Sequence, residues 1–206
     1  MKKIGVFLKT FTIFCRILKL LRRIFGDVLM RNHCHTGPIC YITSVVYNRV
    51  KLFTQPSYIV PLYDSLHYYC CHYHCGLIGY VIMPDHIHLL LWPSASQDVD
   101  CIMRDYKTFT AKRIVRQAVA ENNQELLSLF CEAGIETARC EHKVWQDSFW
   151  EVDVFSEKFV RQKLNYMHRN PVRAGLVQQP EQYPYSSYRN YVLGEEWWIE
   201  VDRRWL

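Results

Sequence analysis

Two histidines lie two positions apart inside an apolar segment, residues 79–91. In an extended strand alternate side chains point to the same side, so His86 and His88 would share one face. Two adjacent imidazoles supply two of the ligands that a divalent metal ion needs. The pair is therefore a candidate half-site for a metal. The alternative is that both are hydrogen-bonded core residues of a strand.

A second polar pair lies late in the chain, in a segment that we expect to be helical. Tyr166 and Asn170 are four residues apart and would share one helix face. A tyrosine hydroxyl beside a metal-bound phosphate can act as a nucleophile, although its ordinary pKa of about 10 means that it needs help from a cation. The amide oxygen of Asn170 could complete a metal shell. Alternatively, Tyr166 is one of fourteen tyrosines that mostly pack, and Asn170 caps the helix.

The elements that must position these groups follow from hydrophobic periodicity and turn residues. Strands are predicted over residues 39–46, 77–83, 86–92 and 144–154. Helices are predicted from Pro56-Ser57 to about residue 71 with Ser57 as N-cap, from 97 onward, and over 156–169. The second and third strands pair as a hairpin, because only Met83-Pro84-Asp85 separates them. Residues 120–142 are polar and predict an irregular connection, and Pro171 predicts the end of the last helix. This order indicates an α+β fold: a ferredoxin-like antiparallel sheet with helices on one face.

Composition sets broad limits on the class of protein. The chain has 206 residues, half of them hydrophobic, which is enough for one domain of ordinary size. A net charge of +5 indicates a mild preference for an anionic partner. Nine cysteines, odd in number and irregular in spacing, indicate reduced thiols and a cytoplasmic location. The Cys70–Cys75 cluster could bind zinc, but no second cluster follows it, so the end of a helix is the simpler interpretation.

The first 36 residues differ from the rest and form a basic, amphipathic N-terminal extension. Its charges interrupt every long apolar run, which argues against a membrane span and against a secretory leader. Such a helix would lie on a membrane surface, on a partner or on DNA. A further alternative is that translation begins at Met30. We expect residues 37–190 to form the catalytic domain and residues 191–206 to form a C-terminal tail.

Four sequence motifs resemble those of a known family. Residues 81–90 are similar to the His-hydrophobic-His (HUH) motif of the single-tyrosine transposases. Residues 165–177, Asn-Tyr-Met-His-Arg-Asn-Pro-Val-Arg-Ala-Gly-Leu-Val, resemble the tyrosine helix of the REP-associated tyrosine transposase branch. Residues 145–150 and 183–188 also match that branch. The resemblance covers about residues 38–190 and leaves the N-terminal extension and the 120–142 connection unmatched.

The resemblance implies an activity as well as a fold. His86, His88 and Asn170 would bind Mg²⁺ or Mn²⁺, and Tyr166 would attack a phosphodiester of single-stranded DNA to give a 5′-phosphotyrosine and a free 3′-hydroxyl. A second strand's 3′-hydroxyl would later rejoin the DNA. The family's usual substrate carries a hairpin beside the cleavage site. Candidate contacts to the DNA backbone are Arg49, Lys51, Lys107, Lys112, Arg113 and Arg116.

Two other functions stay open at this point. The protein could be a domesticated hairpin-binding regulator with little or no strand-transfer activity, or a structural metal-binding protein that uses the Cys70–Cys75 cluster. We expect no stable membrane insertion. Whether the protein is a monomer or a homodimer, and whether Tyr166 acts within its own chain, does not follow from the sequence.

Overall fold

The computed structural model describes residues 37–94, 98–137, 140–194 and 199–205. The chain divides into two units, Met1–Cys34 and His35–Leu206, and every described residue belongs to the second. The N-terminal extension expected over residues 1–36 lies outside the described residues. No helix in the described part of the chain is both long enough and apolar enough to cross a bilayer.

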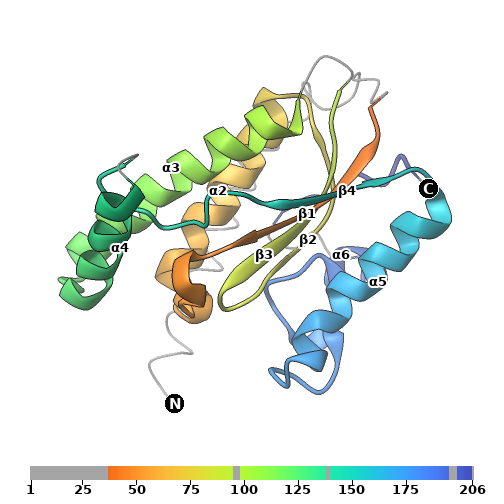
Figure 1. The fold of residues 1–206 in the computed structure, drawn as a ribbon. Coiled ribbons are helices and arrows are strands. Elements are labelled where there is room, and N and C mark those ends of the chain that lie inside the picture. Colours follow the sequence, from red (N-terminus) through yellow and green to blue (C-terminus); the bar gives the residue numbers. More distant parts are fainter. Residues whose placement is uncertain (1–36, 95–97, 138–139, 195–198, 206) are drawn as a thin grey trace, which may run out of the picture. The chain divides into compact units, whose positions relative to one another are not determined.

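A four-stranded antiparallel sheet forms the centre of the second unit (Figure 1). The strand order is β2-β3-β1-β4, and the strands are β1 (Ile39–Val45), β2 (Gly76–Ile82), β3 (His86–Trp92) and β4 (Trp150–Val154). Helix α2 (Pro56–His72) joins β1 to β2, and α3 (Val99–Ala120) follows β3. This is the β-α-β-β-α-β order of the ferredoxin-like plan, so the predicted fold class and the hairpin are confirmed.

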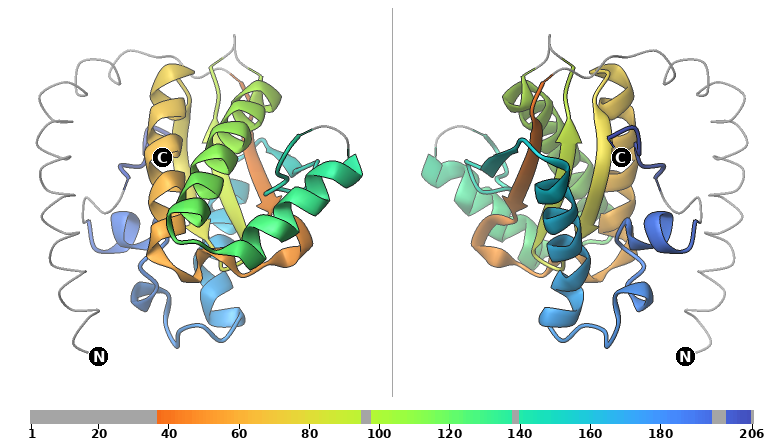
Figure 2. Two further views of the ribbon diagram at one scale, coloured as in Figure 1. Left: turned by 90° about the vertical axis from the view of Figure 1, so that its left-hand side faces the viewer. Right: turned by 90° about the vertical axis from the view of Figure 1, so that its right-hand side faces the viewer.

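Helices cover both faces of this sheet. Apolar residues of α2 and α3 pack with Ile42, Ile87 and Leu89 on one face. Helix α5 (Glu157–Arg173) packs with Leu90 on the opposite face (Figures 1 and 2). The prediction of helices on one face thus holds for α2 and α3, whereas α5 lies on the other. The physical reason is that all seven residues of β2 are buried, so both faces of the sheet need cover.

The connection at residues 120–142 contains a helix that the sequence analysis missed. Helix α4 spans Gln124–Thr137 and buries Leu126, Phe130 and Ala133. These three positions repeat at helical spacing, but the apolar residues Leu127, Leu129 and Cys131 between them obscured the periodicity. The shorter elements are η1 (Tyr47–Arg49), η2 (Leu52–Thr54), η3 (Pro180–Gln182) and α6 (Tyr188–Val192).

Two predicted boundaries and one predicted N-cap were also wrong. Strand β4 starts only at Trp150, because Trp145 forms an isolated bridge with Val46 instead. Helix α2 begins with Pro56 as its first residue, after Gln55 as N-cap, so Ser57 does not cap it. Helix α5 passes through Pro171 to Arg173, since a proline in the last turn removes only one backbone hydrogen bond. Helix α5 starts where predicted: Ser156 is its N-cap, and the Ser156 side chain accepts a hydrogen bond from the Phe159 backbone N–H.

The segment after α5 runs back along the free edge of β2. The backbone N–H of Ile82 donates to the Tyr185 carbonyl at 2.9 Å, and the Ser187 N–H donates to the Tyr80 carbonyl at 2.9 Å. The Tyr183 hydroxyl donates to the Ile82 carbonyl at 2.6 Å. We call residues 183–188 the clasp. It covers an otherwise open sheet edge and ties the chain beyond α5 to the core.

Candidate active site

Strand β3 places the two histidines of the motif side by side, as their spacing predicts. The Nε2 atoms of His86 and His88 lie 3.1 Å apart, and the ring centroids are 4.8 Å apart. His88 is buried, and His86 is about one-fifth exposed. Both imidazoles are on the sheet face that α5 covers, because His88 contacts the rings of Tyr41 and Tyr166. The pair is thus at the bottom of a site between β3 and α5.

The outer nitrogen of His86 faces a carboxylate. Its Nδ1 lies 2.5 Å from Oδ1 of Asp85, and the other oxygen of Asp85 accepts from Arg49 at 3.2 Å. Burial alone would raise the pKa of Asp85, but the hydrogen bonds and charges of His86 and Arg49 lower it below its ordinary value. Asp85 is therefore ionised at neutral pH. An ionised carboxylate fixes Nδ1 of His86 as the protonated nitrogen and leaves Nε2 free as a ligand.

His88 is oriented by two hydroxyl groups from β1. Its Nδ1 lies 2.9 Å from the Tyr41 hydroxyl and 2.8 Å from Oγ1 of Thr43, and its ring stacks on Tyr41 with centroids 5.5 Å apart. Burial and then the charge of His86 lower the pKa of His88 to about 3. The imidazole is therefore neutral at physiological pH, which is the state that coordinates a metal ion.

The chemistry of these donors fits a divalent cation. Nδ1 of each ring has an oxygen partner, so with the proton on Nδ1 of both rings the two Nε2 atoms, 3.1 Å apart, are free to bind one shared cation. Adjacent ligands of an octahedral ion at about 2.1 Å would be separated by roughly 3.0 Å. The carboxylate behind His86 also matches the usual second partner of a metal-bound histidine. The spacing and the chemistry of His86 and His88 therefore fit such an ion.

Helix α5 brings Tyr166 to the histidine pair within the same chain. The ring centroid of Tyr166 is 6.2 Å from that of His88 and 6.4 Å from that of Tyr41, and its side chain is 43% exposed. The Arg173 guanidinium lies 5.1 Å from the Tyr166 ring centroid. The phenol is thus next to the imidazoles, open to solvent and beside a cation. Tyr166 and the histidine pair are therefore close together within one chain.

Asn170 lies one helical turn beyond Tyr166. Its side chain is buried, and its Nδ2 finds no hydrogen-bond partner among the described residues. A buried amide without a partner is costly, so such a group needs an explanation. The oxygen and nitrogen of an amide are assigned from their hydrogen bonds, and here those bonds do not decide the orientation. The side chain is therefore available to a ligand that the chain itself does not supply.

A short hydrogen-bond relay holds α5 against the sheet. His168 Nε2 lies 2.9 Å from Oγ of Ser187, and that oxygen accepts from the Tyr80 backbone N–H at 3.0 Å. The helix also packs tightly on β2: a Cβ added at Gly79 would lie 2.5 Å from a methyl of Leu164. The clasp and Gly79 together fix the height and rotation of α5, and hence the position of Tyr166.

The relay has a consequence for stability at low pH. Burial lowers the pKa of His168 from 6.5 to about 4, so the folded state favours the neutral ring. Protonation of His168 therefore favours the unfolded chain. The stability gained from the neutral ring is complete above pH 6.5 and is lost as the pH falls to 4. We expect His168 to account for about 3 kcal/mol of lost unfolding free energy over that range. Urea unfolding of His168→Gln and of the unmodified chain at pH 7.5 and 4.5 measures this loss of unfolding free energy. If both proteins lost the same amount between the two pH values, His168 would not be its source.

The six basic residues proposed for DNA contact do not share one surface. Arg49 lies beside the site, because it forms an ion pair with Asp85. Lys51 is exposed and lies two residues further along the chain. Lys107 donates to the carbonyls of residues 146, 147 and 148 at 2.6, 3.1 and 3.4 Å, and burial lowers its pKa to about 8. It therefore organises the loop before β4. Lys112, Arg113 and Arg116 belong to α3, which packs on the sheet face opposite the histidines.

Several residues of the site escaped the sequence analysis. Asp85 directly precedes the first histidine, and this adjacency was a usable signal. Tyr41 and Thr43 are found only through the strand register, which pairs Thr43 with His88. Arg173 lies seven residues after Tyr166, two helical turns along the same face, and this spacing could have identified it. His168 and Ser187 were inside quoted motifs, but only the fold connects them.

The Cys70–Cys75 cluster forms no comparable site. The seven described cysteines are free thiols, and Cys70 and Cys75 are buried. Within the described ranges, cysteine, histidine and carboxylate ligand atoms gather in a group of three only at Cys40, Glu151 and Asp153. Burial, followed by the nearby carboxylates, raises the pKa of Cys40, which therefore stays a protonated thiol. The zinc interpretation of the 70–75 segment thus gains no support.

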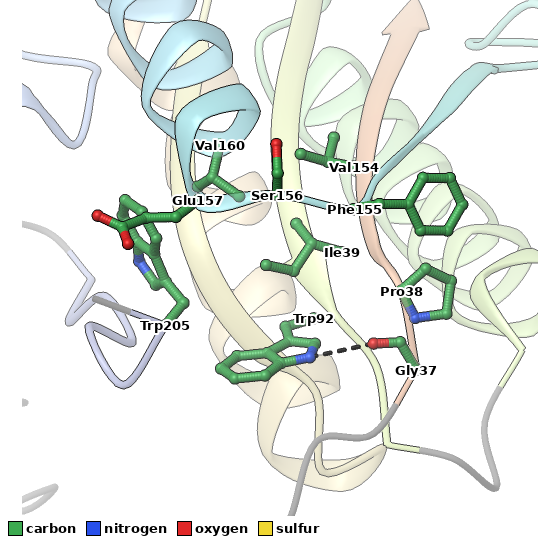
Figure 3. Close-up of a pocket in the computed structure, with 10 residues that line it drawn as sticks. All are labelled: Gly37, Pro38, Ile39, Trp92, Val154, Phe155, Ser156, Glu157, Val160 and Trp205. Atoms are coloured by element: carbon green, nitrogen blue, oxygen red, sulfur yellow. Dashed lines mark hydrogen bonds between the residues drawn. The ribbon is translucent and has the colours of Figure 1, made fainter.

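A cavity of about 430 Å³ lies at the other end of α5, away from the histidines (Figure 3). Its lining includes Trp92, Phe155, Glu157 and Trp205, and the Trp92 indole N–H donates to the Gly37 carbonyl. Trp92 ends β3, six residues after His86, so about 20 Å separate the cavity from the histidine pair. The described lining of the cavity contains no histidine and one carboxylate, that of Glu157.

Comparisons with known proteins agree with this geometry. Residues 39–132 match the family described as "Transposase IS200 like". A Haemophilus influenzae protein assigned provisionally to the REP-associated tyrosine transposases is 29% identical over 160 residues, which cover 77% of this chain and 84% of that protein. The REP-associated tyrosine transposase of Escherichia coli is 24% identical over 116 residues, covering 55% of this chain and 54% of that protein.

A solved structure shares the fold. It is that of a REP-associated tyrosine transposase bound to a REP hairpin, with a TM-score of 0.56 and 20% identity. The match covers 84% of this chain and 89% of that one. At this identity the likeness concerns the fold alone. Taken with the family match and the curated relatives, it confirms the recognition made from the motifs: this chain is similar to the REP-associated tyrosine transposases of the single-tyrosine, His-hydrophobic-His family.

Proposed function

We propose that this protein is a metal-dependent transposase and endonuclease of single-stranded DNA that works through a 5′-phosphotyrosine intermediate. The observation that carries the proposal is the position of Tyr166, whose ring lies 6.2 Å from that of His88 in the same chain. A partly exposed phenol beside two paired imidazoles has the elements of nucleophilic attack on a phosphodiester. The proposed catalytic domain is residues 37–190.

Each side chain has a definite role in the proposed reaction. His86, His88 and Asn170 would hold a Mg²⁺ or Mn²⁺ ion, which supplies charge neutralisation at the scissile phosphate. Asp85 orients His86, and the hydroxyls of Tyr41 and Thr43 orient His88. The Arg173 guanidinium lies beside the Tyr166 ring, where its positive charge can stabilise the negative charge of the phosphate.

The reaction consists of two balanced transesterifications. In the first, the hydroxyl oxygen of Tyr166 bonds to phosphorus, the bond from phosphorus to the 3′-oxygen breaks, and that oxygen takes up the proton that the phenol loses. In the second, a 3′-hydroxyl bonds to the same phosphorus, the phosphotyrosine bond breaks, and the proton returns to Tyr166. Neither step needs a nucleotide cofactor. Positioning by α5 and charge stabilisation provide the catalysis.

The proposed substrate is single-stranded DNA that contains a hairpin. The name of the solved structure with the same fold, a transposase bound to a REP hairpin, supports this choice. Arg49 is placed beside the histidine pair, where it can contact a phosphate next to the cleavage site. Lys112, Arg113 and Arg116 lie on α3, on the far face of the sheet, and would contact only DNA that extends around the domain.

A cleavage assay tests the proposal directly. A single-stranded oligonucleotide with a hairpin and an unpaired flank is labelled at either end and incubated with the protein and Mn²⁺. We expect the 3′-end label to enter a covalent protein adduct, and the 5′-end label to appear as a shorter free strand, because the phosphate stays with the 3′ part. Addition of EDTA should abolish both products. Binding without any adduct would instead support the hairpin-binding regulator.

A further inference from the structure

Strand β4 places a tryptophan in line with the catalytic histidines. Thr43 of β1 pairs with His88 on one side and with Trp150 on the other. Directly opposed residues of antiparallel strands project from the same face, so His88, Thr43 and Trp150 form one row across the sheet. The hydrogen bond between Thr43 and His88 confirms the side to which this row points. Two strand spacings separate His88 from Trp150, which corresponds to about 10 Å.

The Trp150 side chain is left open to solvent. It is 68% exposed, although indole is among the side chains that gain most from burial. Strand β4 is the outer strand of the sheet, and α5 does not cover its first residue. Its neighbour Glu151 points to the opposite face, because side chains alternate along a strand. The face beside the catalytic site thus offers an aromatic platform, whereas the carboxylate is turned away from it.

A cation of α5 lies over β1 on the same face of the sheet. The Lys163 amino group is 4.5 Å from the ring centroid of Tyr41 and 5.1 Å from that of Phe159. Tyr41 pairs with Val152, which is two residues after Trp150 on β4. Tyr41 in turn stacks on His88, with ring centroids 5.5 Å apart. An aromatic platform and an ammonium group therefore flank the histidines, which is the combination that binds single-stranded nucleic acid.

We propose that Trp150 is a base-stacking residue, which holds an unpaired nucleobase of the DNA next to the scissile phosphate, and that Lys163 contacts the adjoining backbone phosphate. This inference rests on the proposed function and names a contact for its unpaired segment. Stacking on indole is tolerant of base identity, because every base presents a π face. Trp150 would therefore align the strand with Tyr166 and would contribute little to the recognition of a paired hairpin.

The test compares two DNA molecules in a background that cannot cleave. Trp150→Ala and Trp150→Phe are each combined with Tyr166→Phe, and affinity is measured for a blunt hairpin and for the same hairpin with an unpaired flank. We expect Trp150→Ala to weaken binding of the flanked hairpin about tenfold and to leave the blunt hairpin unchanged. Trp150→Phe should retain most of the affinity. The matched control is Tyr68→Ala, which removes another exposed aromatic side chain, 58% exposed, from α2.

A spectroscopic measurement locates the contact. The fluorescent base 2-aminopurine is placed in turn at each flank position, and its emission is quenched where it stacks on an indole. Quenching at one position that disappears in Trp150→Ala would agree with the proposal. Equal weakening of both hairpins, unchanged affinity for the flanked hairpin, or quenching that survives the substitution would overturn it.

The adduct assay with unmodified protein separates this inference from the proposed function. If the adduct forms and Trp150→Ala binds normally, only the stacking contact is wrong. If no adduct forms but the flank-specific loss is seen, Trp150 is a binding residue of a protein without strand-transfer activity. If the protein binds neither hairpin, both proposals are overturned.

Discussion

Replacing Tyr166 with phenylalanine is expected to abolish the covalent protein–DNA adduct completely, because the hydroxyl oxygen is the atom that forms the new bond. The phenylalanine ring keeps the contacts with His88, Tyr41 and Arg173, so the site retains its shape. We therefore expect DNA affinity to change by less than about twofold, so that the loss of activity is confined to the chemical step. A denaturing gel measures the adduct, and a mobility shift measures binding.

The control for this substitution removes a hydroxyl elsewhere. Tyr68→Phe on α2 alters an exposed tyrosine that lies outside the site, and it should form adduct at the rate of the unmodified chain. Adduct formation by Tyr166→Phe at an undiminished rate would show that another residue is the nucleophile. Equal loss of binding and of adduct would show that Tyr166 serves the packing of α5 and not the reaction.

Removal of either imidazole is expected to have the second-largest effect. His88→Ala or His86→Ala takes away one of two nitrogen donors that lie 3.1 Å apart. We expect cleavage to fall about a thousandfold, which corresponds to about 4 kcal/mol of transition-state stabilisation. Affinity for Mn²⁺, measured by calorimetry without DNA, should fall more than the 10- to 100-fold that loss of a second-shell partner causes.

A histidine outside the site provides the matched control. His72 is exposed at the end of α2, and His72→Ala should leave both Mn²⁺ affinity and cleavage unchanged. His88 also packs against Tyr41, so thermal unfolding of each variant should accompany the metal titration. Full cleavage by a folded His88→Ala variant would remove the metal assignment, even if Tyr166 remained essential.

The sequence by itself determined the local chemistry of this protein. Alternation within β3 was enough to put His86 and His88 on one face, and helical spacing was enough to put Tyr166 and Asn170 one turn apart. The β-hairpin of β2 and β3 was predicted because only three residues separate the two apolar segments. These features depend on neighbours close in sequence, and therefore the sequence pattern predicts them well.

Only the tertiary structure decided which distant groups meet. The register of β1 against β3 brings Thr43 and Tyr41 to His88, and the register of β1 against β4 adds Trp150 to the same row. The tertiary structure also separates basic residues that looked alike in the sequence: Lys107 supports a loop, while Arg49 lies at the site. The placement of α5 on the opposite face from α2 and α3, held by the clasp, sets Tyr166 beside His88. These outcomes depend on packing between segments up to about a hundred residues apart, and the energies that select them are sums over whole interfaces, which no local pattern of residues records.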